Sequence, residues 1–225
     1  MTAPATPVLL EACVDSVAAA RAAGEGGAGR LELCDFSVNG GITPGLDLIE
    51  AVRRAVRLPL HVLIRPGGGG GGGTFNFDED EVLAMMRRIS DCKRLGVDGV
   101  VLGALDRAGN VDEPVTEALI AVARPLAVTF HRAFDTTPDP HAALEALIGL
   151  GIDRVLTSGG APAAEAGIPI LKELIQRAGG RITIMAGGGV RAGNAARIVR
   201  ETGVRELHST GGTEGIAAIG AALAG

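Results

Sequence analysis

The chain has 225 residues, of which 47% are hydrophobic, and a formal net charge of -5. This length and composition allow one sizeable core and give no sign of a second domain. Basic residues are spread along the chain, and five Phe occur with neither Trp nor Tyr, so nucleic acid and an anionic membrane surface are excluded as expected partners. No apolar run approaches the about 20 residues of a membrane span, and the N-terminus lacks signal-peptide features, so we expect a cytoplasmic protein.

Short β-branched or Leu-rich runs alternate with segments of helical periodicity along the whole length. Gly27, Gly96, Gly151 and Gly203 each end a helical segment just before such a run, as expected of the glycine that closes a helix in an αβ loop. The regular repeat predicts a single (β/α)8 TIM barrel at residues 8–225, preceded by a flexible tail at residues 1–7. The eight predicted strands are residues 8–14, 30–34, 60–65, 99–105, 127–132, 154–158, 182–187 and 205–209.

Polar side chains gather at the carboxyl ends of these predicted strands, where barrels carry their functional residues. Residues two apart on a strand share a face, so several of these side chains are expected to converge inside one end of the barrel. A buried ion-pair layer that fixes the strand register is the alternative interpretation of each of them. The candidates for acid–base chemistry are Glu11, Glu32, His131, Asp135 and His208.

Glycines and basic residues at the same end indicate a site for a small anionic ligand. The segment AGGGVRAGN follows the seventh predicted strand, and glycines ahead of a helix expose backbone amides to an anion. A tight turn that simply requires glycine is the alternative. An anion site would suit an enzyme that acts on a small anionic, for example phosphorylated, metabolite by acid–base chemistry. The candidate ligand-binding residues are Arg65, Arg132, Ser158, Gly159, Gly187, Gly188 and Gly189.

Two of the three cysteines occupy equivalent positions on the first two predicted strands. Cys13 and Cys34 each lie two residues after an inward Glu, and neighbouring strands are about 4.8 Å apart, so the thiols are expected to meet at the barrel mouth. Two soft thiolates suit Cu(I) better than a closed zinc site, which wants four ligands. Small apolar fillers are the alternative. Cys92 lies on the apolar side of a helical segment and is expected in the core, and all three are expected to be reduced.

Several motifs together resemble those of the copper homeostasis protein CutC family. They include LEACVDS from Leu10, GRLELC from Gly29, TFHRAFD from Thr129, DRVLTSGG from Asp153 and ELHST from Glu206. The resemblance implies a (β/α)8 barrel, a cytoplasmic location, and homo-oligomers, either dimers or tetramers. It also implies copper handling, with Cu(I) bound by Cys13 and Cys34, and it attaches no firm enzymatic reaction. A scaffold that acts through oligomer contacts is a third possibility.

The chain departs from the family pattern after the third predicted strand. IRPGGGGGGGTF stands where the family has IRPRGGDF, so an arginine and an acidic residue are replaced by glycine. Ala186 and Gly29 are further departures, from IMPGGG and GGADR respectively. The glycines at residues 67–73 form a flexible coil with a span of about 15 Å, so we expect a loose lid without fixed ligand contacts. The helix that follows is expected to be capped by Asp78, with Glu81 in a capping box.

Overall fold

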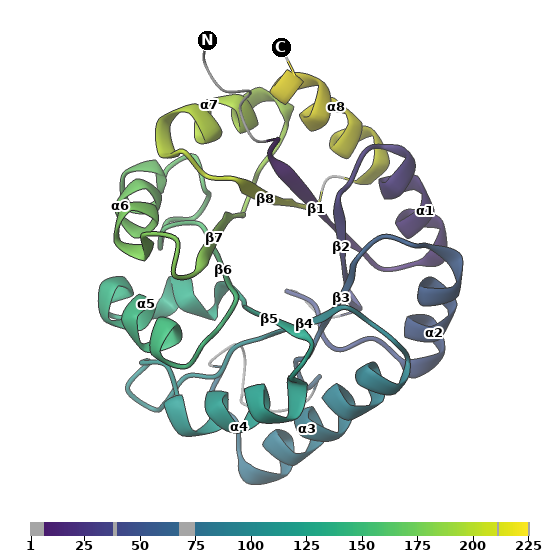
Figure 1. Ribbon diagram of the computed structural model, residues 1–225, viewed down its shortest axis with the longest axis vertical. Helices are drawn as coiled ribbons and strands as arrows, with labels where there is room; N and C mark the ends of the chain where they lie inside the picture. Colours follow the sequence, from purple (N-terminus) through teal and green to yellow (C-terminus); the bar gives the residue numbers. More distant parts are fainter. Residues whose placement is uncertain (1–6, 38–39, 68–74, 211, 225) are drawn as a thin grey trace.

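Eight parallel strands close into a barrel with helices around it in the computed structural model, which describes residues 7–37, 40–67, 75–210 and 212–224 (Figure 1). The fold prediction is confirmed, and each predicted strand coincides with an observed one. The strands are β1 (Leu9–Val14), β2 (Arg30–Leu33), β3 (Leu60–Leu63), β4 (Gly99–Leu102), β5 (Ala127–Phe130), β6 (Arg154–Thr157), β7 (Thr183–Ala186) and β8 (Glu206–Ser209).

A helix follows every strand and covers the outside of the barrel (Figure 1). A short 3-10 helix, η1 (Arg132–Thr136), precedes α5. The helices are α1 (Val17–Glu25), α2 (Leu46–Ala55), α3 (Glu79–Arg94), α4 (Glu113–Ala123), α5 (Pro140–Gly149), α6 (Ile168–Ala178), α7 (Ala192–Thr202) and α8 (Gly212–Ala224).

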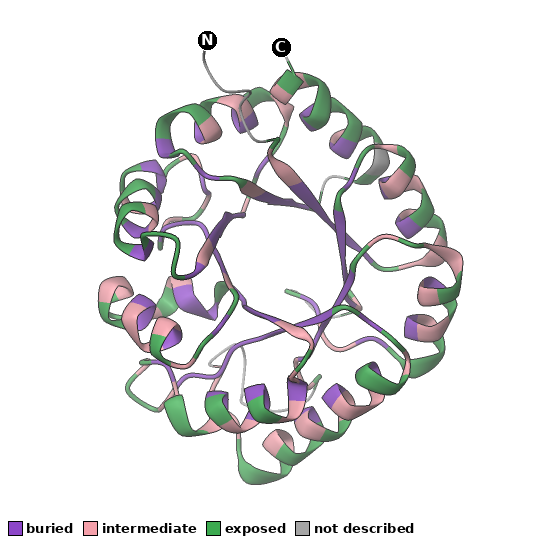
Figure 2. Ribbon diagram, viewed as in Figure 1, coloured by how far each residue is buried: buried purple, intermediate pink, exposed green. Residues whose placement is uncertain are grey.

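The main hydrophobic core lies between the strands and the helices. Figure 2 shows buried strands and helices that are buried only on their inner faces. Leu31 and Leu33 point outward from β2 into this core, where they join Ile49 and Val52 of α2. Cys92 of α3 is in the same cluster, as predicted. Because alternate strand residues face opposite sides, the remaining residues of each strand face the barrel interior, where the polar side chains lie.

Glycines with positive φ lie between helices and strands at the positions that the sequence predicts. Gly27, Gly96, Gly151 and Gly203 have φ angles of 93°, 70°, 73° and 76°. The predicted tail and lid lie outside the described residues, apart from Pro7 and Gly67.

The predicted capping box begins α3. The Asp78 side chain accepts a hydrogen bond from the Glu81 amide at 2.9 Å, and the Glu81 carboxylate accepts one from the Asp78 amide at 3.0 Å.

Replacing Asp78 by alanine is expected to lower the free energy of unfolding by about 1 kcal/mol, because one amide of the first turn loses its acceptor. Urea denaturation measures the change. Asp80→Ala is the matched control, since Asp80 is exposed in the same turn and makes no capping bond; equal losses for both variants would contradict the prediction.

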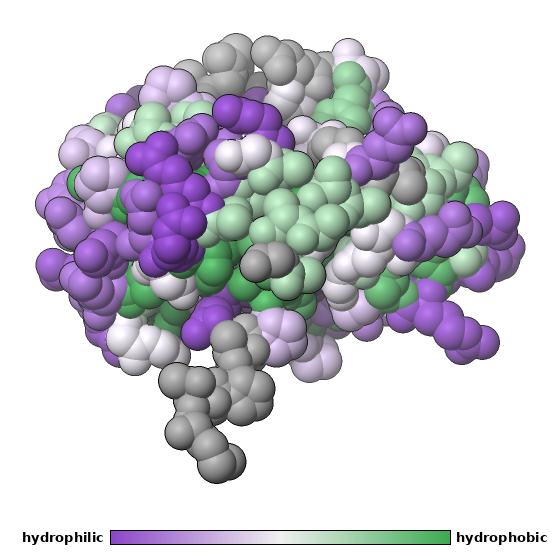
Figure 3. All heavy atoms as spheres, turned by 90° about the horizontal axis from the view of Figure 1, so that it is seen from above, coloured by the Kyte–Doolittle hydropathy of each residue, from purple (hydrophilic) through white to green (hydrophobic). Residues whose placement is uncertain are grey.

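The outer face of α8 is made mostly of small residues: apart from Glu214, its exposed positions include Ala217, Ala218, Gly220, Ala221 and Ala224. Figure 3 shows a pale green, moderately hydrophobic area between hydrophilic ones on the side of the molecule that carries α7 and α8.

Within the described ranges, no helix combines the length and the apolar character that crossing a bilayer requires.

Candidate functional site

An ion-pair layer crosses the barrel interior near the amino ends of the strands. Arg30, on β2, donates through Nε to Glu11 and through Nη2 to Glu206, 2.5 Å away. Arg154 donates to the same Glu206 carboxylate at 2.5 Å. Arg30 and Glu11 are 3% and 0% exposed, so water does not compete for these bonds. The layer links β1, β2, β6 and β8. It is a buried ion-pair layer of the kind that the sequence analysis gave as the alternative to an acid–base role for Glu11.

His208 lies above this layer and contacts two carboxylates. Its Nδ1 is 2.9 Å from Glu11 Oε1, and its Nε2 is 3.4 Å from Glu32 Oε2. Burial lowers the pKa of His208, but hydrogen bonds with Cys13 and Glu11 and the charges of Glu32 and Glu11 outweigh it and hold the pKa well above its usual value. The ring is therefore an imidazolium that donates from both nitrogens. The prediction that Glu11, Glu32 and His208 converge is confirmed by these contacts.

The two glutamates beside His208 differ in charge state. Burial raises the pKa of Glu11, but the His208 hydrogen bond and the Arg30 charge outweigh it and hold the pKa well below its usual range. For Glu32, burial outweighs the His208 charge and, together with the neighbouring Glu11 carboxylate, raises the pKa to about 7. Glu11 is thus a permanent carboxylate, whereas Glu32 gains or loses its proton near neutral pH.

The two predicted thiols meet at the mouth above these carboxylates. Cys13 Sγ and Cys34 Sγ are 2.6 Å apart, and both side chains are buried with Leu63 and Val101 in a small cluster of inward-facing residues. A second donor group shares Cys13: the ligand atoms of Cys13, Glu32 and His208 lie within 4.8 Å of one another.

Both thiols are held in their protonated form. The hydrogen bond with Cys34, burial and the Glu32 charge raise the pKa of Cys13 well above its usual value. The bond from Cys13 lowers the pKa of Cys34, but burial and the nearby carboxylates outweigh it and raise the pKa to about 11. A metal that binds these sulfur atoms has to displace their protons.

Arg65 and His131 lie on another side of the mouth, at the ends of β3 and β5. Both contact Phe75: the Arg65 guanidinium carbon is 5.1 Å from the Phe75 ring centroid, and the His131 ring centroid is 4.9 Å from it. Among the described residues, no hydrogen bond or ion pair joins His131 to Glu11 or Glu32. The acid–base candidates therefore divide into a β1, β2 and β8 group and a separate His131.

Asp135, the fifth acid–base candidate, is held in a network of its own. Its carboxylate accepts hydrogen bonds from Thr157 Oγ1 at 2.5 Å, from the amides of Ser158 and Gly160 at 3.0 and 3.1 Å, and from Arg132 Nε at 2.7 Å. Arg132 also donates to Ser158 Oγ at 3.0 Å. These donors saturate the Asp135 oxygens, so the residue fixes the loop after β6 and orients Arg132.

The predicted glycine cradle is only partly available to a ligand. The Gly159 amide donates to Thr157 Oγ1 at 2.8 Å, and the Gly187 amide donates to the Thr157 carbonyl at 3.0 Å. Among the described residues, the amides of Gly188 and Gly189 have no acceptor. Gly188 lies under Arg132, since a Cβ atom there would be 3.2 Å from the Arg132 guanidinium carbon.

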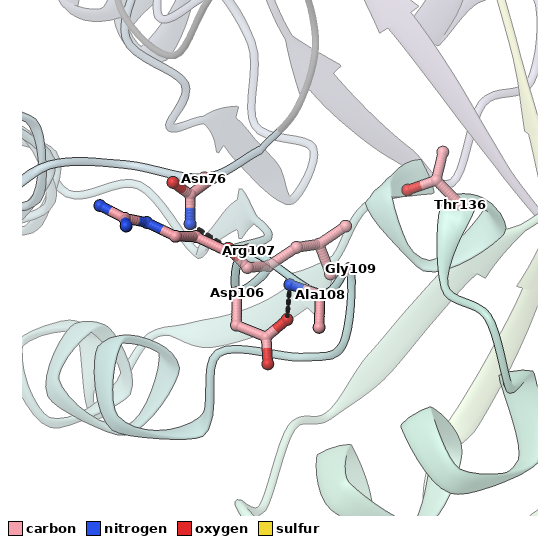
Figure 4. Close-up of a pocket in the computed structure, with 7 residues that line it drawn as sticks. Asn76, Asp106, Arg107, Ala108, Gly109 and Thr136 are labelled. Carbon is pink, nitrogen blue, oxygen red and sulfur yellow. Dashed lines mark hydrogen bonds between the residues drawn. The ribbon is translucent and has the colours of Figure 1, made fainter.

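Two pockets lie at the surface of the barrel, and the smaller one includes Cys13. One, of about 260 Å³, is lined by Cys13, Asp15, Phe36, Thr210 and Ile216 among others. The other, of about 510 Å³, lies at the β4–α4 loop, where Asn76 faces residues 105–109 (Figure 4). In that pocket the Asp106 carboxylate accepts from the Ala108 amide (Figure 4) and from the Asn110 amide of the same turn, so it is occupied within the loop.

Comparison with known proteins identifies the family. The CutC family matches residues 8–213 of the chain. The chain belongs to the CutC family. It is 46% identical to the mouse protein named copper homeostasis protein cutC homolog over 200 residues, which are 89% of this chain and 72% of the mouse protein. It is 48% identical to family protein CutC of Xylella fastidiosa over 201 residues, 89% of this chain and 74% of that protein.

Solved structures agree with this membership. A CutC protein from Streptococcus agalactiae superposes with a TM-score of 0.84 at 32% identity, and the match covers 90% of this chain and 98% of that one. Thiamine phosphate pyrophosphorylase from Pyrococcus furiosus has a TM-score of 0.66 at 16% identity, covering 96% of each chain, and this likeness shows the fold alone.

Some residues of this CutC site were not singled out from the sequence. Arg30 and His61 are buried in the interior, Arg154 donates to Glu206 and Thr129 there, and Phe75 contacts both Arg65 and His131. Strand parity could have identified the first three, because Arg30 shares a face with Glu32 and His61 shares one with Leu63 and Arg65. Phe75 follows the glycine run, where no periodicity exists to place it.

Proposed function

We propose that this chain is a cytoplasmic copper homeostasis protein that binds Cu(I) through Cys13 and Cys34. The observation that carries the proposal is the 2.6 Å separation of the two Sγ atoms at the barrel mouth. Thiolates are the ligands that Cu(I) prefers, and proteins of this family from mouse and human are named for copper homeostasis. The proposal includes the homo-oligomer that the family resemblance implies, which light scattering of the purified protein would test.

The donor set fits the ion if the sulfur atoms separate. A metal–thiolate bond is about 2.3 Å long, so two sulfur atoms that face each other across one ion lie well beyond 2.6 Å apart. Leu63 and Val101 pack against the thiols without polar atoms of their own, which leaves the sulfur atoms free of competing side-chain hydrogen bonds on that side. Because both thiols are protonated, Cu(I) binding releases protons, and the affinity should rise with pH.

The donor group of Cys13, Glu32 and His208 offers one sulfur, one nitrogen and one oxygen. Such a mixed set suits a divalent ion such as Zn²⁺ better than Cu(I). His208 is an imidazolium between two carboxylates, so it would have to lose a proton before it could bind a metal. The thiol pair is therefore the favoured site for Cu(I), and Glu32 serves to separate the two possibilities in an experiment.

Competition with a chromogenic Cu(I) chelator under reducing conditions tests the proposal. We expect the wild-type protein to withdraw Cu(I) from the chelator, and Cys13→Ser combined with Cys34→Ser to abolish this. Cys92→Ser is the matched control, since Cys92 is equally buried but lies in α3 away from the mouth. Glu32→Gln should retain Cu(I) binding.

Unchanged competition by the double cysteine variant would refute the thiol site. Loss of Cu(I) binding in Glu32→Gln, with Zn²⁺ binding lost in parallel, would instead assign the metal to the mixed donor group. Circular dichroism of each variant shows whether the barrel is intact, so that a loss of binding is not confused with unfolding.

A further inference from the structure

The inward residues at the ends of β3, β4 and β5 form one layer of the mouth. Leu63 pairs with Val101, and Val101 pairs with Thr129, in the parallel register of the three strands. The next inward layer, just beyond the ends of these strands, contains Arg65, Gly103 and His131. Gly103 has no side chain to fill the space between the other two, and a Cβ atom there would lie 2.5 Å from His131 Nδ1.

His131 presents a hydrogen-bond donor that has no acceptor among the described residues. Its Nδ1 accepts the Ala133 amide at 3.2 Å, so in the neutral ring the proton is on Nε2. Burial, followed by the Arg65 charge, lowers the pKa of His131 to about 3, and the ring is neutral at physiological pH. Its Nε2 is buried without a partner among the described residues, and His131 is only 7% exposed, so bulk water does not readily supply one. A buried donor left in this state is costly and is typical of a site whose partner is a ligand.

Arg65 presents a charge that has no counterion among the described residues. Its guanidinium donates through Nη1 to the Gly41 carbonyl at 3.2 Å, and no carboxylate of the described residues lies within ion-pair distance of it. Arg132, at the same end of the barrel, is paired with Asp135. A half-buried guanidinium whose other donors have no partner among the described residues favours a carboxylate or phosphate oxygen.

Phe75 holds these two groups on one side of the mouth. Its ring contacts both Arg65 and His131, and its carbonyl accepts the Leu105 amide at 2.8 Å. Asn76, in the wall of the pocket in Figure 4, donates to the Leu105 carbonyl at 3.0 Å and fixes the next residue of the segment. Phe75 has a φ of 55°, a strained conformation for a bulky residue, and it is retained by these two hydrogen bonds.

We infer that Arg65 and His131 bind an oxyanion, the carboxylate or phosphate group of a small molecule, at the β3–β5 side of the mouth. Arg65 supplies the charge and His131 Nε2 supplies a neutral donor. The apolar face of Phe75 offers contact for the carbon skeleton of the ligand. This site uses neither the thiols of the proposed copper site nor the Glu32 carboxylate and His208 imidazolium beside them, and it does not rest on that proposal.

Thermal-shift titrations with inorganic phosphate and with malonate test the site, and they separate a phosphate from a carboxylate ligand. We expect at least one probe to raise the melting temperature of the wild-type protein in a saturable way. Arg65→Gln should weaken that probe by about tenfold or more, because a charge-assisted hydrogen bond is lost. His131→Asn should also weaken it, since the asparagine oxygen can still accept the Ala133 amide while the Nε2 donor is removed.

Arg107→Gln is the matched control, because Arg107 is an exposed arginine on the adjacent β4–α4 loop, and it should bind the probe as the wild type does. The double cysteine variant should also retain probe binding, and Arg65→Gln should retain Cu(I) binding, so failure of either proposal is seen separately. A crystal structure of the wild type with the tighter probe locates it directly. Absence of any wild-type shift, a shift unchanged in Arg65→Gln and His131→Asn, or density away from these side chains would overturn the inference.

Discussion

Replacing Arg30 by methionine is expected to lower the free energy of unfolding by about 3–5 kcal/mol, the largest loss for any single substitution in the barrel interior that we predict. Arg30 is 3% exposed and lies between the carboxylates of Glu11 and Glu206. Methionine has a similar length but no charge, so Glu11 would keep a buried negative charge with only His208 as its partner. Urea denaturation at neutral pH, followed by circular dichroism, measures the loss.

Arg54→Met is the matched control for this prediction. Arg54 pairs with Glu50 on the exposed side of α2, and such pairs contribute at most about 1 kcal/mol. Adding Glu11→Gln to Arg30→Met should restore part of the stability, because the unpaired charge is then removed. A loss no greater than that of the Arg54 variant would mean that the Glu11 carboxylate is not buried as an ion.

The barrel itself could be predicted from the sequence because its determinants are local. Hydrophobic alternation, and a glycine before several of the strands, report on segments of about ten residues, and eight repetitions of strand and helix leave one simple closed arrangement. The meeting of Cys13 with Cys34 followed from the same information, since neighbouring parallel strands with equivalent inward positions bring those positions together.

The partners inside the barrel could be predicted only in part. Strand parity places Glu11, Arg30 and Glu206 on inward faces. Which of them meet depends on the stagger between neighbouring strands, and the residues of a single strand do not determine that stagger. Glu11 is level with Arg30 on one side and with His208 on the other. Of this cluster, only Glu11 is therefore named as a candidate from the sequence, which identifies neither Arg30 nor the ion pairs.

The loops were the least predictable part. Gly159 and Gly187 belong to a pattern that is typical of anion cradles, yet their amides are satisfied by Thr157. Asp135 belongs to a motif that is typical of a functional acid, yet its oxygens hold the β6 loop. Side-chain to backbone hydrogen bonds of this kind depend on the exact path of a turn, which residue type alone does not determine.

Glu32 gives the stability of the protein a characteristic dependence on pH. Its pKa is raised from 4.5 in the unfolded chain to about 7 in the barrel, so between these values the folded protein holds a proton that the unfolded chain releases. Stability from Glu32 is therefore full below pH about 4.5 and is lost as the pH rises toward 7, by about 3 kcal/mol at 1.4 kcal/mol per pKa unit. Glu11 acts in the opposite direction, because its pKa is lowered and its contribution is lost as the pH falls.

Glu32→Gln is consequently expected to gain stability relative to the wild type as the pH rises, by about 3 kcal/mol between pH about 4.5 and about 7. Glutamine keeps the shape and a hydrogen-bonding oxygen near His208 Nε2 but has no proton to release. Urea denaturation of both proteins across this range measures the difference, and Glu79→Gln, an exposed position in the first turn of α3, should show no comparable trend. A difference in stability between Glu32→Gln and wild type that stays constant with pH would show that Glu32 ionises normally in the folded protein. It would contradict the conclusion that the Glu32 carboxyl beside His208 and Cys13 holds a proton near neutral pH.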